Sequence, residues 1–208
     1  MLAVGLLSTL RAPAQTPTVT TASVAVPAEI AAPVAGLIAP KVTTVTTSTT
    51  KVELWWVTSL PLREDAKAPA WSEVAEGALV GALRIGSAWS EIRGYTIRPG
   101  VYTLRFALQP QNGDHMGISP NREFLLLAPA ADDTSPEPAG YEGAVELAKK
   151  AARRSHPASL SIDPPSASAP PLNTTTNDLG HQVVIVSLPT SAGAPLTFGL
   201  VVEGTIEH

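Results

Sequence analysis

The chain has 208 residues, which is enough for one domain with a substantial buried core or for two small domains. Its 14 basic and 18 acidic residues give a formal net charge of −4, which argues against a protein that binds nucleic acid by neutralising phosphates. The absence of cysteine excludes disulfide bonds, thiolate metal sites, iron–sulfur clusters and cysteine nucleophiles.

The first fourteen residues have the pattern of a secretory signal peptide. Residues 1–10 form a largely apolar, uncharged run, and Ala12, Pro13 and Ala14 provide a small-x-small cleavage site. The run is not preceded by the usual basic residues, and it is too short to cross a bilayer, so we expect no transmembrane span. We therefore expect cleavage after Ala14 and export to the periplasm or the extracellular space. An unprocessed apolar terminus is the alternative.

Residues 15–50 are rich in Thr and Pro and predict either an extended arm or short strands at a sheet edge. Pro27, Pro33 and Pro40 follow one another too closely for a long helix. The apolar content is too high for a plain solvated linker, so strands interrupted by Pro are the better interpretation. As an arm, this segment could wrap around a partner.

Alternating apolar and polar residues predict strands along the rest of the chain. In residues 51–60, Val52, Leu54 and Trp56 share one face of the strand, and Trp55 lies on the other. This pattern predicts that Trp56 is in the core and that Trp55 lies under the helix or the arm, or faces a partner. Further strands are predicted over residues 78–85, 124–127, 182–188 and 196–206.

Residues 95–108 predict a β-hairpin around Pro99 and Gly100, because Pro presets its own φ and Gly accepts the positive φ of a type II turn. The stretch from Arg98 to Leu104 resembles the Pro-Gly-x-Tyr-x-Leu hairpin of secreted bacterial β-sandwich modules of prealbumin-like type. That resemblance implies an exported sandwich module with a binding or structural role, and it transfers no catalytic residue.

One amphipathic helix is predicted over residues 141–154, followed by a Pro-rich, low-complexity loop over residues 163–178. The apolar stripe of the helix consists of Tyr141, Ala144, Val145, Ala148, Ala151 and Ala152. With about seven to nine strands and this helix, the chain is predicted to be mainly β. We expect an antiparallel β-sandwich that forms a single domain over residues 51–208.

The tryptophans are candidates for a binding surface. All four lie within 35 residues, and exposed aromatic side chains bind sugars and anchor protein interfaces. We therefore consider Trp55, Trp71 and Trp89 as surface candidates. Core packing is the alternative for each of them.

Two groups of side chains are candidates for metal binding. Asp114 and His115 could ligate a metal, but in an Asn-Gly-rich loop they are better explained as turn residues. Asp132, Asp133 and Glu137 offer oxygen ligands to calcium but lack the spacing of a dedicated loop. We therefore expect no bound metal and no cofactor.

No nucleophile elbow, phosphate loop or zinc-protease motif occurs in the sequence. The leading interpretation is a non-enzymatic, exported binding protein or accessory subunit of an envelope assembly, with a protein as its partner. Two alternatives remain open. One is a carbohydrate-binding module that uses the tryptophans, and the other is a metal-dependent enzyme centred on Asp114 and His115.

Overall fold

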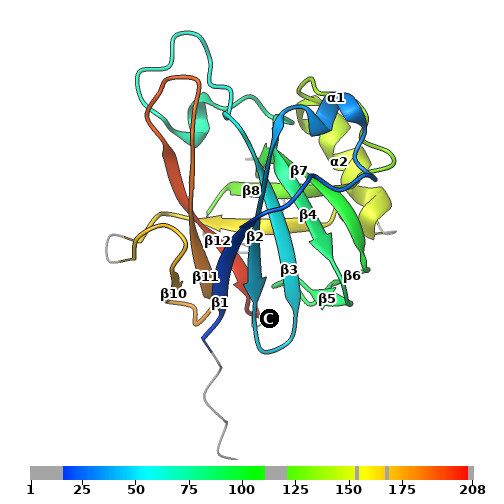
Figure 1. Cartoon of the computed structure of the whole chain (residues 1–208), viewed down its shortest axis with the longest axis vertical. Coiled ribbons are helices and arrows are strands. Elements are labelled where there is room, and N and C mark those ends of the chain that lie inside the picture. The colour runs from blue at the N-terminus through cyan, green and yellow to red at the C-terminus, as the bar shows by residue number, and fades with distance from the viewer. Residues whose placement is uncertain (1–15, 111–120, 153–154, 167–168, 206–208) are drawn as a thin grey trace, which may run out of the picture.

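The computed structural model describes residues 16–110, 121–152, 155–166 and 169–205 (Figure 1). The fold is mainly β, and the named strands pair in an antiparallel sense, as the alternation predicted. The predicted signal peptide, residues 1–14, lies outside the described residues.

Ten strands form one sheet, in the order β1-β2-β3-β4-β7-β8-β9-β12-β11-β10. Its first part contains β1 (Thr18–Ser23), β2 (Ile38–Thr46), β3 (Lys51–Val57), β4 (Leu79–Ile85), β7 (Gly100–Leu108) and β8 (Glu123–Pro129). Its second part contains β9 (Ser159–Asp163), β10 (Thr174–Thr176), β11 (Gln182–Leu188) and β12 (Leu196–Glu203). A separate two-stranded sheet is formed by β5 (Trp89–Ser90) and β6 (Thr96–Ile97).

The strands outnumber the seven to nine that we expected, because several are too short for alternation to be visible in the sequence. β5 and β6 have two residues each, and β10 has three. β10 lies within the predicted Pro-rich loop of residues 163–178 and pairs with β11, so that segment is not wholly loop. In residues 15–50, β1 and β2 pair with each other, and β1 is an edge strand of the large sheet.

The amphipathic helix is α2 (Gly140–Ala152), which begins one residue before the predicted range and buries Ala144, Ala148 and Ala151. A four-residue helix, α1 (Ala32–Ala35), and a 3-10 turn, η1 (Trp71–Glu73), complete the described helices. Within the described ranges, no helix is both long enough and apolar enough to cross a membrane.

The large sheet curls back on itself at β9, which pairs with β8 on one side and with β12 on the other. Figure 1 shows β8 passing behind β2 and β3 as the sheet turns. The curl brings β3 opposite β12, where the rings of Trp56 and Phe198 lie 6.1 Å apart. A bridge between Leu60 and Thr190 also joins the chain after β3 to the chain after β11. The main core is therefore enclosed between the two parts of one sheet.

Gly81 of β4 makes room for a tryptophan within this core. A Cβ at this position would lie 2.3 Å from the carbonyl oxygen of Trp55 and 3.1 Å from the ring of Trp56 on the paired strand. Any side chain here would push β3 and β4 apart, so glycine is required by the close approach of the two backbones.

The predicted hairpin around Pro99 and Gly100 is wrong. β6 pairs with β5, whereas Gly100 begins β7 and pairs with Ile85 of β4. The positive φ that a type II turn needs is found instead at Gly94, whose φ is 79°. The tight turn is therefore six residues earlier than the Pro-Gly pair indicated. The pairing of Gly100 with β4 decides the conformation there, and local turn preference does not.

Candidate functional site

Trp55 is in the interior and not on a binding surface. Its side chain is 0% exposed, and its indole N–H donates to the carbonyl oxygen of Val24, 3.2 Å away. Arg84 lies over the indole ring at 5.3 Å and reaches Glu29 on the same crossing segment. The chain that follows β1 therefore covers this face of β3 (Figure 1). Of the alternatives that the sequence left for Trp55, the structure shows burial under the arm.

The other tryptophans also pack inward. Trp89 is 4% exposed. Trp71 stacks on Phe106 at 4.7 Å and meets Phe198 edge-on at 5.1 Å. Trp56, which we expected to be the buried member of its pair, is partly exposed but packs against the main core. Trp55 and Trp89 are therefore buried and do not form the exposed surface that we considered.

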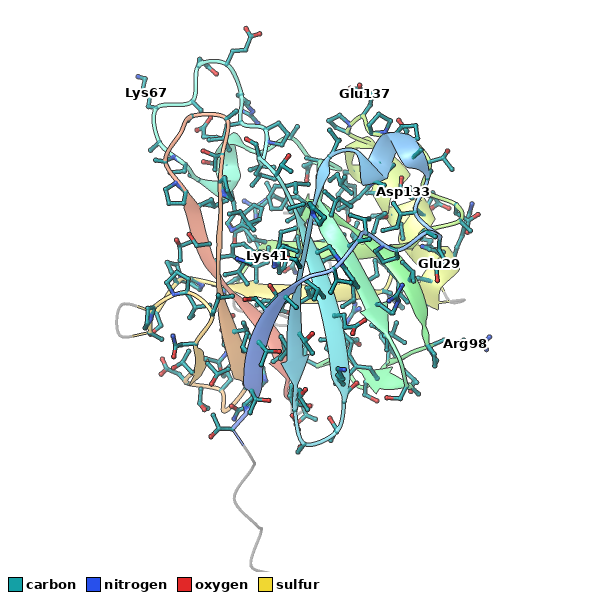
Figure 2. All side chains as sticks on the ribbon, in the orientation of Figure 1. Glu29, Lys41, Lys67, Arg98, Asp133 and Glu137 are labelled. Carbon is teal, nitrogen blue, oxygen red and sulfur yellow. The ribbon has the colours of Figure 1, made fainter. Side chains whose placement is uncertain are left out.

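The acidic residues considered as metal ligands are used in other ways. Asp133 is 2% exposed and receives Arg105 Nε and Nη2, each at 2.7 Å, together with the hydroxyl of Thr103. Asp132 lies at the surface, 3.0 Å from the ammonium of Lys150. Figure 2 shows Asp133 within the body of the molecule and Glu137 at its edge. The two neighbouring aspartates therefore have separate cationic partners.

Asp114 and His115 lie outside the described residues. Within the described ranges, no three His, Cys, Asp or Glu side chains are grouped closely enough to hold a metal ion.

A cavity of about 310 Å³ lies between α2 and the neighbouring strands, and it is the strongest candidate for a functional site. Its volume is at the lower end of the range for small-molecule sites. Four segments line it besides Phe124 of β8: the turn after β5 (Ile92, Arg93), the end of β7 and its continuation (Gln109, Pro110), one side of α2 (Tyr141, Val145, Lys149), and the chain from the end of α2 into β9 (Ser155, His156, Pro157, Ser159, Ser161).

One wall of the cavity is a single face of α2. Tyr141, Val145 and Lys149 are four residues apart, so they stack along one side of the helix. The adjacent face carries Ala144 and Ala148, which pack with Ala107 and Leu126 of the sheet. Small alanines thus hold α2 close to β7 and β8, and the larger side chains beside them line the cavity.

The opposite wall is the outer face of β9. Leu160 and Ile162 point into the main core, whereas Ser159 and Ser161 alternate with them and are half-buried. Ser161 pairs with Phe124 on β8. Because serine fills much less volume than the leucine or isoleucine usual beneath a covering helix, space remains between this strand and α2.

Arg93 is held firmly at the rim. Its Nε donates to Glu91 at 2.9 Å, and its Nη2 donates to the carbonyl oxygen of Pro157 at 3.0 Å. Glu91, 4% exposed, also accepts the backbone N–H groups of Arg93 and Tyr95, which fixes the turn between β5 and β6. The guanidinium of Arg93 lies 5.2 Å from the ring of Tyr95. These contacts fasten the β5–β6 turn to the chain after α2.

Tyr141 supplies a neutral hydroxyl to the cavity. Burial raises the pKa of its phenol above the ordinary value, and the nearby charge of Glu76 raises it further, while Lys149 lowers it in part. The group is therefore protonated at neutral pH and can donate a hydrogen bond. With Lys149 and Arg93, whose side chains have hydrogen-bond donors and no acceptors, it makes the lining of the cavity rich in donors.

We expect the raised pKa of Tyr141 to be measurable by alkaline titration. The tyrosinate absorbance of the protein should contain a component, absent from Tyr141→Phe, with a midpoint above that of free tyrosine. Lys149→Gln should move this midpoint higher still, because the cation that lowers the pKa is removed. Because the folded-state pKa is raised, the associated stability is present below the unfolded pKa and is lost as pH rises through the folded pKa. A midpoint at or below the ordinary value would contradict this assignment.

Sequence reasoning missed this cavity. The helical stripe and the helix end were recognised, but β9 was not predicted as a strand. The available signal was the alternation Ser159-Leu160-Ser161-Ile162, in which one face is apolar and the other is small and polar. Such a strand beside an Ala-rich helix indicates incomplete filling of the layer between them.

Comparisons with models of protein families, with curated proteins and with solved structures find no match to this chain.

Proposed function

We propose that the protein is an exported, non-enzymatic binding protein with a β-sandwich architecture, and that its ligand site is the cavity beneath α2. The observation that carries the proposal is the cavity itself, whose volume is about 310 Å³. Its lining combines apolar side chains with polar groups that come from α2, β9 and the segments that connect the strands, and a mixture of apolar and polar side chains is found in small-molecule sites. Ile92, Phe124 and Val145 supply the apolar surface.

Other parts of this proposal rest on the sequence alone. Export depends on residues 1–14, and a role as accessory subunit of an envelope assembly, with a protein partner, depends on composition and on the Pro-rich segments. The resemblance to prealbumin-like modules would imply the same compartment and architecture. These three points stay predictions.

The two alternative functions have less support. A carbohydrate-binding module would need exposed aromatic platforms, but Trp55 and Trp89 are buried, and Trp71 stacks on Phe106. A metal-dependent enzyme centred on Asp114 and His115 would depend on residues outside the described ranges.

The proposal is tested by binding of prodan, a neutral dye whose emission shifts to the blue in apolar surroundings. We expect the protein to bind prodan with one site and Ser161→Phe to abolish that binding, because the new ring would occupy the space opposite Phe124. Equilibrium titration of dye fluorescence gives both results. Thermal unfolding of Ser161→Phe checks that the variant is folded, since filling a cavity should preserve or raise stability.

The matched control is Ser187→Phe. Ser187 is also a half-buried serine on a strand, but it lies on β11 next to Thr197 and not at the cavity. This variant should bind prodan as the unmodified protein does. Equal loss of binding in both variants, or undiminished binding in Ser161→Phe, would refute the cavity as the site.

A further inference from the structure

We propose that the cavity beneath α2 selects an apolar molecule that carries a single carboxylate. The inference rests on the proposed function, since it specifies the chemical class of the ligand for the same site. It is carried by the charges and hydrogen-bond donors that line the cavity and by the apolar surface between them.

The charged side chains of the lining are cationic. Arg93 and Lys149 lie on it, and none of its described residues is Asp or Glu. A ligand that enters this space loses solvent on its apolar part and meets donors from Lys149, Arg93 and the phenol of Tyr141. An anionic group satisfies such donors, whereas an amine would be left beside two cations without an acceptor of opposite charge.

The carboxylates that pair with these cations do not occupy the cavity. Glu91 is not a lining residue, and its carboxylate already accepts hydrogen bonds from Arg93 and from the backbone N–H of Tyr95. Glu146, the partner of Lys149, is 69% exposed. A solvated ion pair of that kind contributes little, so Lys149 can exchange Glu146 for a ligand carboxylate at small cost.

The same geometry favours a carboxylate over a phosphate. The guanidinium of Arg93 already donates through Nε to Glu91 and through Nη2 to the carbonyl oxygen of Pro157. These two N–H groups are therefore not available to bind two oxygens of a phosphate side by side. Lys149 is then the main cation available for exchange, and a single lysine with a neutral phenol suits one negative charge better than two. We expect the rest of the ligand to be mainly apolar, since Ile92, Phe124 and Val145 offer it apolar surface.

The size of the cavity restricts the ligand to a small one. Its volume of about 310 Å³ corresponds to about ten molecules of liquid water. A medium-chain fatty acid or an aromatic acid of similar size meets this limit, and octanoate is a suitable probe.

The experiment compares octanoate with 1-octanol, which has the same chain length and no charge, by displacement of prodan from the full chain. We expect octanoate to bind about tenfold more tightly than 1-octanol, as one charge-assisted hydrogen bond in a half-buried site provides. Lys149→Gln should remove most of this advantage by weakening octanoate binding, and it should leave the affinity for 1-octanol unchanged.

The neighbouring lysine provides the control. Lys150 follows Lys149 on α2 but does not line the cavity, and it pairs with Asp132 at 3.0 Å. Lys150→Gln changes the net charge by the same amount and should keep the preference for octanoate within about twofold, since an exposed charge outside the site acts weakly through solvent.

Each outcome decides between the two proposals. If prodan binds and octanoate shows no advantage over 1-octanol, or if Lys149→Gln and Lys150→Gln behave alike, the carboxylate inference is overturned while the binding site stands. If neither prodan nor octanoate nor 1-octanol binds, the proposed function itself fails.

Discussion

Asp133→Asn is expected to lower the free energy of unfolding by about 3–5 kcal/mol, because it leaves Arg105 as a buried cation without its counter-charge. Arg105 is 1% exposed and makes two hydrogen bonds to the Asp133 carboxylate. Its guanidinium also donates to the backbone carbonyls of Gly77, Ser135 and Glu137. This single side chain thus fastens the segment before α2 to the start of β4. Urea denaturation of the variant measures the loss.

Asp132→Asn is the matched control, since it removes a carboxylate from the adjacent residue. Asp132 is exposed and pairs with Lys150, so its loss should cost no more than about 1 kcal/mol. Combining Asp133→Asn with Arg105→Met should cost less than the sum of the two single changes, because the unpaired charge is then gone. Equal effects of the two Asp→Asn changes would show that the Arg105–Asp133 pair contributes no more than a surface pair.

Trp55→Ala is expected to destabilise the protein by about 3–5 kcal/mol, as removal of a buried tryptophan side chain does. Trp55 is fully buried beneath the chain that follows β1. Trp56→Ala should cost less, since Trp56 is partly exposed. Thermal or denaturant unfolding of both variants ranks the two losses.

A conservative change separates packing from hydrogen bonding at this position. Trp55→Phe keeps most of the apolar volume but removes the N–H that donates to the Val24 carbonyl, and it should cost less than Trp55→Ala. If Trp56→Ala proved the more damaging of the two alanine variants, the burial of Trp55 under the arm would be contradicted.

The strand pattern of residues 51–57 could be predicted from the sequence, but the covering of its two faces could not. Alternation correctly placed Trp55 and Trp56 on opposite sides of β3. Lys51 and Glu53 share the side of Trp55 and suggested solvent there. The segment that covers Trp55 comes from residues before β2, and it contacts β3 and β4 through residues that are distant in sequence, Val24 with Trp55 and Glu29 with Arg84. The alternation of residues within one strand does not show whether a segment from elsewhere in the chain packs over one of its faces.

The hairpin error has a different cause. Pro99 and Gly100 satisfy the local rules for a turn, but Gly100 is instead the first residue of β7 and pairs with Ile85 of β4. The turn at Gly94 is not visible in local turn rules, because the group that stabilises it is the side-chain carboxylate of Glu91, which accepts the backbone N–H groups of Arg93 and Tyr95. Local turn rules indicate which residues can form a turn, but they do not show which strands pair with one another.

The large parts of the fold were predictable for a simple reason. β3, β4, β8, β11 and β12 are long enough for their apolar pattern to be visible, and α2 has a continuous apolar stripe. The cavity depends on a relation between α2 and β9, and the Arg105–Asp133 pair joins residues 28 positions apart. Both are tertiary features, and a single sequence reveals them only after the elements have been assembled.

The pairing of β9 on both sides also has a consequence for the order of folding. The first part of the sheet is built from strands that follow one another closely in the chain, so it can form through local contacts. β9 joins β8 through three residue pairs and β12 through two, and its partner in β12 lies far along the chain. Non-local pairing of this kind is slow, because the chain loses the entropy of closing a long loop before the contacts between the two strands can form. Phe106, Leu125 and Leu127 share one core with residues of β11 and β12, so we expect them to stay exposed to water until β12 pairs, and we expect the chain to be most prone to aggregation during that interval.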